Sequence, residues 1–342
     1  MFCFIKKYNK IIKNYKNKSD FIIDNKMVSS DGSINYIMSK KTNVNNIIEC
    51  RYVRRNEDYI SAYLSSHTGC IMGCKFCWLT QSKQNTFKHT NIDDYAYQLE
   101  TILSNTLDPI ENRKNIRINI NFMARGEVMA NKYVLKDYKK LYDTLNNIAL
   151  KYNYKSIKMN LSTIFPYTIK NYNLEDIFES RPVNIYYSLY SVNQKFRKEF
   201  IPNAIDVKMS LDKLKQFQIH HNNENTIVFH WALIKGENDN IHDVEEMANI
   251  IKSYNFINTK FNLVRLNPFI KDNKPIMLES EYSKLIKIFN IMNDCVTNKV
   301  PTQQSRIINR IGPDVYASCG MFSNTTIDLT EFNKIISEYD DN

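Results

Sequence analysis

The stretch SHTGCIMGCKFC, residues 66–77, decides how the whole chain is interpreted, because it places three cysteines within eight positions. Three residues separate Cys70 from Cys74, and two residues separate Cys74 from Cys77. Cysteine thiolates hold iron–sulfur clusters, and three thiolates on one short loop can bind three irons of a cubane. The fourth iron is then left without a protein ligand. The spacing therefore predicts a [4Fe–4S] cluster with one open iron.

An open iron of this kind can chelate the amino and carboxylate groups of S-adenosylmethionine (SAM). Electron transfer from the cluster then breaks a C–S bond of SAM and releases a 5′-deoxyadenosyl radical. Phe76, which precedes the last cysteine, is typical of the radical SAM superfamily. The alternative is a zinc site with His67 as a fourth ligand, but zinc usually takes four ligands in paired Cys or Cys/His sets. We therefore expect a [4Fe–4S] cluster and SAM as the cofactors.

The composition of the 342-residue chain is that of a folded protein, with 43% hydrophobic and 24% charged residues. The net charge of +10 favours a polyanionic partner such as nucleic acid. Lys and Asn are frequent throughout, however, and genome composition explains the charge equally well. Seven cysteines, three of them crowded together, argue against a secreted disulfide framework and for the reducing cytoplasm. No apolar run is long enough to span a bilayer, so no membrane partner is expected.

Strand and helix patterns alternate along most of the chain. Strands are expected at residues 59–66, 116–122, 156–162, 183–189, 226–234 and 259–266, with a last strand near 304–310. Helices are expected at about 135–152, 207–219, 241–254 and 279–296, and Thr90 with Asp93 resembles a capping box for a helix ending near residue 105. Alternating strands and helices imply a parallel sheet. Six such units are too few for a closed eight-stranded barrel, so the expected fold class is α/β with a partial (β/α)6 barrel.

Distinctive residues follow the carboxyl ends of these strands, where function lies in a barrel of parallel strands. They are Gly126 and Glu127 after the second strand, Ser162 at the end of the third, Ser188, Leu189 and Tyr190 at the end of the fourth, and Asn267 after the sixth. Each residue alone would be an ordinary turn signal. Their agreement with the strand ends indicates one site around the cysteine loop.

A set of short motifs extends well beyond that loop. The motifs are Ile48-Glu49 with Tyr52, Leu64-Ser65-Ser66 before Gly69-Cys70, Phe122-Met123 with Gly126-Glu127 and Asn131, Leu161-Ser162-Thr163, Ser188-Leu189, Arg197 with Ile201-Pro202, Asn262-Leu263 with Asn267-Pro268-Phe269, and Asp314 with Ala317-Ser318-Cys319-Gly320. On these residues, from about 46 to 322, the chain resembles the RlmN/Cfr family of radical SAM adenine methyltransferases. The cysteine triad alone is common to the superfamily, whereas the final Ala-Ser-Cys-Gly points to this family.

The resemblance implies a reaction and a role for each of these residues. Gly126 and Glu127 would hold the SAM amino group and Ser162 its ribose side, with Ser188, Leu189, Tyr190 and Asn267 completing the pocket. Cys319 would carry a methyl group from one SAM, and a radical made from a second SAM would activate it for addition to C2 or C8 of an RNA adenine. Glu49 would be the general base that removes the ring proton. The RNA would be large-subunit rRNA or tRNA, the electron donor a flavodoxin or ferredoxin system, and the protein a monomer.

The composition of the two ends and the extent of the resemblance together divide the chain into three parts. Residues 1–45 would form a short basic accessory segment, and residues 46–322 the radical SAM partial barrel with its catalytic C-terminal cysteine loop. Residues 323–342 would form an acidic tail.

The chain departs from the family at several positions. The family has a second cysteine seven positions before the first cluster cysteine, and it releases the product by forming a disulfide with the methyl-carrying cysteine. Here that position is Tyr63, and Val128, Tyr190 and Met321 also differ from the family pattern. Cys50 is a candidate for the missing thiol. Two alternatives stay open: a radical SAM enzyme acting on a non-RNA substrate, and a catalytically impaired RNA-binding relative.

Overall fold

The computed structural model describes residues 15–106, 109–179, 181–222, 225–272, 274–296, 304–318 and 320–323, together with residues 330, 332 and 334. The strands in these ranges are β1 (Phe21–Val28), β2 (Ile34–Lys40), β3 (Asn43–Asn56), β4 (Tyr59–Tyr63), β5 (Arg117–Phe122), β6 (Ser156–Thr163), β7 (Asn184–Tyr187), β8 (Ile227–Ala232), β9 (Thr259–Val264), β10 (Ile270–Lys271), β11 (Lys274–Pro275) and β12 (Arg306–Ile308). The α-helices are α2 (Trp78–Gln81), α3 (Ile92–Ser104), α4 (Lys132–Lys136), α5 (Tyr138–Lys151), α6 (Leu174–Phe178), α7 (Gln194–Phe200), α8 (Val207–His220), α9 (Ile241–Ser253) and α10 (Tyr282–Asn293).

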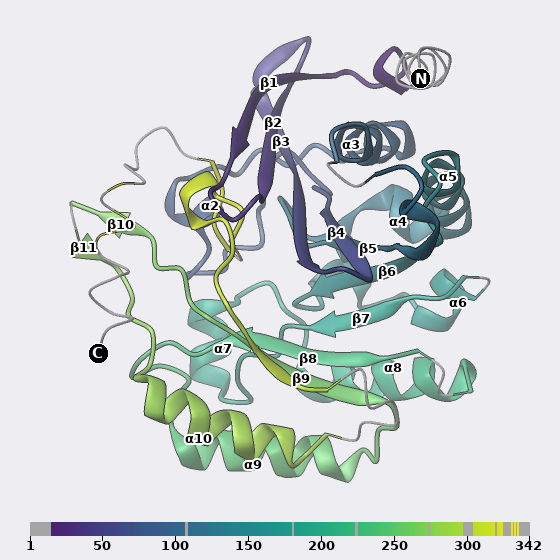
Figure 1. The fold of residues 1–342 in the computed structure, drawn as a ribbon. Coiled ribbons are helices and arrows are strands. Elements are labelled where there is room, and N and C mark those ends of the chain that lie inside the picture. The colour runs from purple at the N-terminus through teal and green to yellow at the C-terminus, as the bar shows by residue number, and fades with distance from the viewer. Residues whose placement is uncertain are drawn as a thin grey trace.

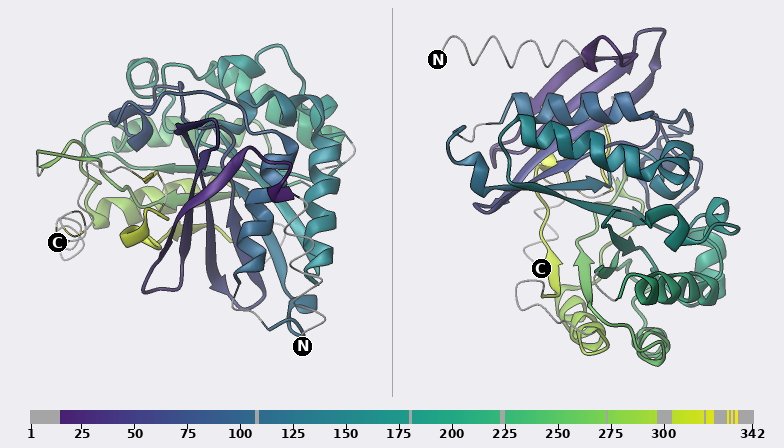
Figure 2. Two further views of the ribbon diagram at one scale, coloured as in Figure 1. Left: turned by 90° about the horizontal axis from the view of Figure 1, so that it is seen from above. Right: turned by 90° about the vertical axis from the view of Figure 1, so that its right-hand side faces the viewer.

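One large sheet organises the described part of the chain, with the strand order β1-β2-β3-β4-β5-β6-β7-β8-β9-β12. The strands from β4 to β9 pair in parallel, and β12 adds a further parallel strand beside β9. Strands β1 to β4 pair antiparallel, so the N-terminal strands extend the sheet away from the barrel (Figures 1 and 2). The expected α/β fold with an open parallel sheet is confirmed.

The helices cover the outer face of the curved sheet. Helices α3 and α5 lie over the sheet near β4 to β6, whereas α9 and α10 lie at the other end, beside β8 and β9 (Figure 1). Alternation along the strands explains this arrangement. In β5, Ile118 and Ile120 are buried in the core under the helices, whereas Asn119 and Asn121 face the barrel interior. Of the helices in the described ranges, none is long and apolar enough to cross a membrane.

Several elements are shorter than the sequence predicts, and two helices also differ in how they begin or divide. The capping box is formed by Asn91 and Asp94, one residue later than expected, because the Thr90 hydroxyl instead donates to the carbonyls of Ser65 and Ser66. The helix expected at 135–152 is divided into α4 and α5, which separate at Asp137.

The structure describes much of the expected N-terminal segment but little of the expected C-terminal tail. Residues 21–40 of the expected accessory segment form the hairpin β1–β2 of the main sheet. The expected acidic tail lies almost wholly outside the described residues.

Glu100 on α3 is an unusual buried acid in this fold. Its side chain is 1% exposed, and neither of its carboxylate oxygens has a hydrogen-bond partner among the described residues. Burial raises the pKa of Glu100 to about 8, against the smaller opposing effect of Lys151. At neutral pH the folded protein therefore holds this carboxyl in its protonated form.

We predict that Glu100→Gln removes part of the pH dependence of stability. In the unfolded chain Glu100 ionises near its ordinary pKa of 4.5, whereas in the folded chain it keeps its proton up to about pH 8. The unfolded state thus binds fewer protons in this window, and the free energy of unfolding falls by up to about 1.4 kcal/mol per pH unit as the pH rises. Urea unfolding measured across this window should show a shallower fall in Glu100→Gln. The exposed Glu111→Gln serves as the control and should behave like the wild type; an unchanged slope in Glu100→Gln would contradict the assignment.

Candidate functional site

A cavity of about 160 Å³ opens at the carboxyl ends of the parallel strands and gathers most of the residues expected from the sequence. Its wall includes Cys70, Cys74, Cys77, Gly126, Glu127, Ser162, Ser188, Tyr190, Asn267 and Gly320. These residues come from segments spread over some 250 positions of the chain. The structure therefore brings the cysteine loop and the strand-end residues to one place.

The three cysteines fit a multi-iron cluster better than a single zinc ion. All three thiols line the cavity, but a structural zinc ion needs four ligands and the loop supplies three. His67, the possible fourth zinc ligand, already has both ring nitrogens in contact, Nδ1 with the Ser66 hydroxyl and Nε2 with His89, each at 3.0 Å. The donor set is thus three thiols, which suits the iron–sulfur alternative.

Close backbone packing fixes the cysteine loop. Cys70 N donates to the Gln84 carbonyl at 3.1 Å, and a Cβ added at Gly69 would lie 2.4 Å from the same oxygen. Burial raises the pKa of Cys70 and Cys74, and the neighbouring cysteines raise it further. Without a cation the thiols stay protonated, so binding of iron must release their protons.

Gly126 and Glu127 line the same cavity as the cysteines. Gly126 has a φ of +94°, and an added Cβ would lie 2.6 Å from the Ser66 hydroxyl, so only glycine fits here. Glu127 accepts hydrogen bonds from the backbone N–H groups of Met129 (3.0 Å) and Ile164 (3.1 Å). Burial nevertheless raises the pKa of Glu127 to about 7. A ligand ammonium placed in the cavity would favour the ionised carboxylate.

The remaining expected pocket residues divide into those that line the cavity and one that does not. Tyr190 adopts a φ of +61°, and its ring stacks on Phe76 with centroids 4.3 Å apart. Asn267 donates to the Ser318 hydroxyl at 3.1 Å. Leu189, by contrast, has a fully buried side chain in the core, and its carbonyl accepts hydrogen bonds from the Ser191 N–H (2.7 Å) and from Arg197 (3.0 Å).

Glu49 does not line the cavity but forms a buried ionic group, here called the Glu49 cluster, with Arg51 and Arg125. Arg125 Nε donates to Glu49 Oε1 at 2.7 Å and Arg51 Nη2 to Glu49 Oε2 at 3.1 Å. All three side chains are at most 1% exposed. Burial alone would raise the pKa of Glu49, but the two guanidinium groups outweigh it and lower the pKa to about 2.

The Glu49 cluster binds the C-terminal loop on both sides of position 319. Arg51 donates to the carbonyls of Ser318 (3.3 Å) and Met321 (2.6 Å), and Arg125 donates to the Ser323 carbonyl at 3.2 Å. Ser323 returns hydrogen bonds to Glu49 from its backbone N–H (3.0 Å) and its hydroxyl (2.9 Å). Three side chains from β3 and the segment after β5 thus hold the loop.

Cys319, the expected methyl carrier, lies outside the described residues. Its two neighbours are described: Ser318 is bound by Asn267 and Arg51, and Gly320 lines the cavity. The sequence did not predict that Arg51 and Arg125 are buried and hold this loop. Arg125 directly precedes the Gly126-Glu127 motif, and a cation next to a site motif is a reason to test its role. Its burial, however, depends on partners that are distant in the sequence.

The position of Cys50 argues against the hypothesis that it replaces the missing thiol. Alternation along β3 places Cys50 on the opposite face from Glu49, where it is fully buried in the core. Burial raises its pKa well above the ordinary value, and Glu49 adds to the effect. Tyr63 instead lines a small cavity together with Ser318, Ala317 and Arg51. A phenol therefore lies beside the C-terminal loop where relatives are expected to have a thiol.

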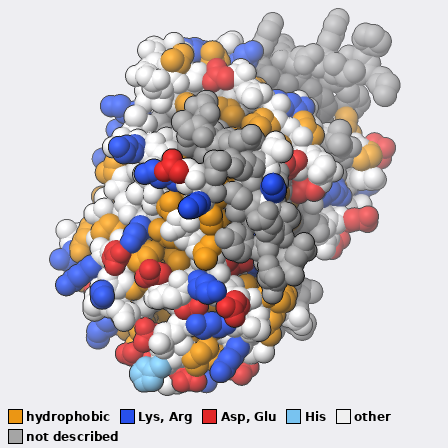
Figure 3. Space-filling view, turned by 90° about the vertical axis from the view of Figure 1, so that its left-hand side faces the viewer, with side chains coloured by type: hydrophobic (Ala, Val, Ile, Leu, Met, Phe, Trp, Pro, Cys, Tyr) orange, Lys and Arg blue, Asp and Glu red, His pale blue; other side chains and the backbone are white. Residues whose placement is uncertain are grey.

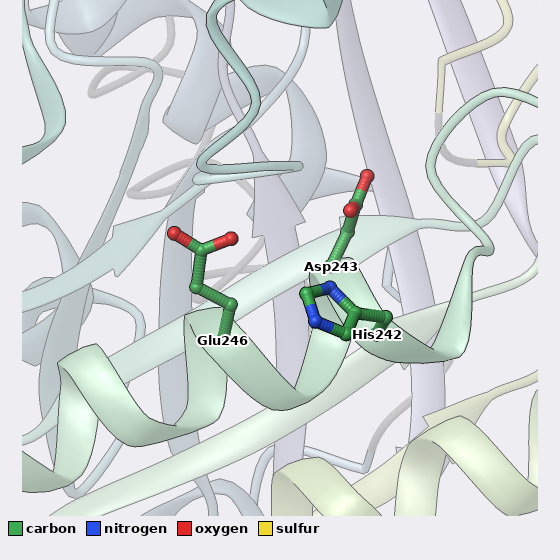
Figure 4. Close-up of side chains that lie close together, drawn as sticks. All are labelled: His242, Asp243 and Glu246. Carbon is green, nitrogen blue, oxygen red and sulfur yellow. The ribbon is translucent and has the colours of Figure 1, made fainter.

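A second group of possible ligands lies at the start of α9. The ligand atoms of His242, Asp243 and Glu246 are within 4.8 Å of one another, and the three side chains project from one end of the helix (Figure 4). His242 and Glu246 are exposed. Exposed acidic groups of this kind are common without an ion, and no other feature at this place points to a ligand.

Comparison with known proteins finds relatives along most of the chain. No family model matches it. The chain is 25% identical over 320 residues to the dual-specificity RNA methyltransferase RlmN of Ruthia magnifica. The aligned region covers 92% of this chain and 79% of that protein. It is also 25% identical to the RlmN proteins of Francisella tularensis (78% of this chain, 67% of the relative) and Aliarcobacter butzleri (70% and 65%). A radical SAM methyltransferase from Sphaerobacter thermophilus has the same fold, with a TM-score of 0.71 at 17% identity over 89% of this chain and 81% of that one.

Proposed function

We propose that this chain, a divergent relative of the RlmN RNA methyltransferases, is a radical SAM enzyme that methylates C2 or C8 of an adenine in RNA through a methylated Cys319. The observation that carries the proposal is the single cavity that joins the three cysteines, Glu127 and the C-terminal loop. The similarity to proteins named RlmN supports the RNA substrate.

Each part of the cavity has a task in this reaction. Cys70, Cys74 and Cys77 would hold a [4Fe–4S] cluster, which when bound supplies the electron that cleaves SAM. Glu127 would bind the SAM ammonium, since its carboxylate is buried and aimed into the cavity. The strand-end residues Ser162, Ser188, Tyr190 and Asn267 would surround the rest of SAM. The apolar part of the wall, with Trp231 and Phe322, would exclude water from the radical.

The C-terminal loop would present Cys319 to both SAM and RNA. In the structure its flanks are held by the Glu49 cluster, so the loop is fixed next to the cavity before RNA binds. Glu49 can serve as the general base only after it is released, because its oxygens are bound by Arg51, Arg125 and Ser323 and its pKa is about 2. Movement of Ser323 away from Glu49 would remove two of those hydrogen bonds and raise its proton affinity.

The experiment that tests the proposal is anaerobic reconstitution with iron, sulfide, SAM and a reductant. We expect 5′-deoxyadenosine to form and mass spectrometry of the peptide containing Cys319 to show an added methyl group. Cys319→Ala should still form 5′-deoxyadenosine but carry no methyl group in that peptide. Radical formation with Cys319 unmodified would contradict the methyl-carrier role and favour a different substrate. Absence of 5′-deoxyadenosine in a protein that holds its cluster would contradict radical chemistry altogether.

A further inference from the structure

The interior of the barrel holds a group of cations at the end away from the cysteines. Arg117 is the first residue of β5, Lys158 lies near the start of β6, Lys260 near the start of β9, and Arg306 is the first residue of β12. We call these four residues the lumen cations. Their positions are two or four residues from side chains that line an interior cavity, so they share the inward face of the sheet.

The lumen cations have no acidic partner in the described part of the chain. None of the four forms an ion pair there; the hydrogen-bond partner of the Arg117 side chain is the amide of Asn119, at 3.1 Å, and its guanidinium lies 5.6 Å from the ring centroid of Tyr59. Lys260 is only 8% exposed. Burial, and then the neighbouring cations, lower the pKa of Lys158 and Lys260 to about 8. The four charges therefore repel one another at neutral pH without compensation.

This concentration of cations contrasts with the one outer face that Figure 3 shows. On the face shown in Figure 3, basic and acidic side chains are interspersed and form no single-sign patch over the part drawn in colour. Isolated surface cations are well solvated, whereas cations that converge in a partly buried space attract an anion much more strongly.

The cavity beside the lumen cations has the size and the lining of a small-anion site. It measures about 60 Å³, which is room for roughly four waters and so for one tetrahedral oxyanion. Its wall includes Arg306, Tyr59, Tyr186 and Asn262. Arg117, Lys158 and Lys260 are not part of this wall, but each lies two residues before an asparagine that is, Asn119, Asn160 and Asn262 respectively. Asn262 is 2% exposed, and its side-chain oxygen has no hydrogen-bond partner among the described residues. Because amide oxygen and nitrogen can be exchanged by rotation, this group can instead turn its NH₂ to an anion.

We propose that this end of the barrel binds an oxyanion of the phosphate type, held by Arg117, Lys158, Lys260 and Arg306. The ligand is either free phosphate or the phosphate group of a small phosphorylated molecule. The wall of this cavity shares Met123 and His230 with the wall of the larger one, so a bound anion lies behind the SAM cavity rather than within it. The site does not depend on the proposed methyl transfer.

Calorimetric titration of the reconstituted full-length protein tests the site. Inorganic phosphate at constant ionic strength should bind saturably at one site, and Lys158→Met/Lys260→Met should weaken this binding about tenfold or more, because two charged contacts are lost. Lys139→Met/Lys140→Met removes two exposed charges from α5 and should bind phosphate like the wild type. Arg306→Gln should also weaken phosphate binding. Because the Arg306 side chain is exposed, this substitution should leave the fold intact.

Further arms of the titration identify the source of the anion and separate this site from the catalytic one. Tighter binding of ribose 5-phosphate than of inorganic phosphate would assign the site to a phosphorylated molecule, and the reverse order to free phosphate. Formation of 5′-deoxyadenosine should be unchanged in the lysine variants. Equal affinity of wild type and Lys158→Met/Lys260→Met, or no saturable binding of either anion, would overturn the proposal.

Discussion

A Cys74→Ser protein is expected to lose its iron–sulfur cluster and all formation of 5′-deoxyadenosine. Cys74 is the middle one of the three proposed cluster ligands, and it lines the cavity. A serine hydroxyl ionises far less readily than a thiol and is a poor ligand for iron, so a cubane with one iron already open would keep only two good protein ligands. The visible absorption of the reconstituted protein, its iron and sulfide content and its 5′-deoxyadenosine should all fall to background.

Cys295→Ser is the matched control for this prediction. Cys295 is a buried thiol that packs in the core beside α10 and donates to the Met292 carbonyl, a bond that a serine hydroxyl can replace. This variant should assemble the cluster like the wild type. A Cys74→Ser protein that retained iron, sulfide and radical formation would show that the loop is not the cluster site.

Glu49→Gln should destabilise the protein by about 3–5 kcal/mol, the usual cost of breaking a buried ion pair. The carboxylate faces two buried guanidinium groups, so its loss leaves both without an opposite charge. Arg125→Met in the Glu49→Gln background should recover part of the loss, since it removes one of the two unpaired charges. Urea unfolding of the metal-free protein at neutral pH measures all three proteins.

The exposed Glu57→Gln, at the turn between β3 and β4, should change the free energy of unfolding by less than about 0.5 kcal/mol. Acid titration offers a second check on Glu49. Its pKa falls from 4.5 to about 2 on folding, so its contribution is complete above pH 4.5 and is lost as the pH falls toward 2. A Glu49→Gln protein as stable as the wild type would contradict the ionic cluster. A loss of activity in a destabilised Glu49→Gln protein would not identify Glu49 as the base.

The sequence predicted best what local spacing determines. The cysteine loop and the strand-end residues Gly126, Glu127 and Ser162 form one cavity, because parallel strands bring their carboxyl ends together. Leu189 was expected in the same pocket, but the positive φ of Tyr190 bends the chain and leaves Leu189 in the core. Backbone turns of this kind leave no clear mark in the sequence.

Two other features depended on long-range contacts and could not be read from the sequence. The strands β1 and β2 lie in a basic segment, and β1 leaves Ile22 and Ile23 exposed at the sheet edge, so its alternation is weak. The burial of Arg51 and Arg125 depends on a loop about 200 to 270 positions away. A charged residue becomes a core residue only when such partners are in place.

Hydrogen bonds between the N-terminal strands and the C-terminal loop can form only late while the chain is synthesised on the ribosome. The hydroxyl of Ser29, in the turn between β1 and β2, donates to Asp314, 285 positions later, and Glu49 binds Ser323, 274 positions later. On the ribosome Glu49 and Arg51 can pair with each other as soon as β3 is made, but their contacts with the loop form only after Ser318, Met321 and Ser323 have been synthesised. Before these contacts form, the cysteine loop is already made, while the part of the cavity wall that Gly320 and Phe322 supply is absent. An iron–sulfur cluster at the proposed site would therefore have an open route into the nascent barrel until Gly320 and Phe322 fold into place.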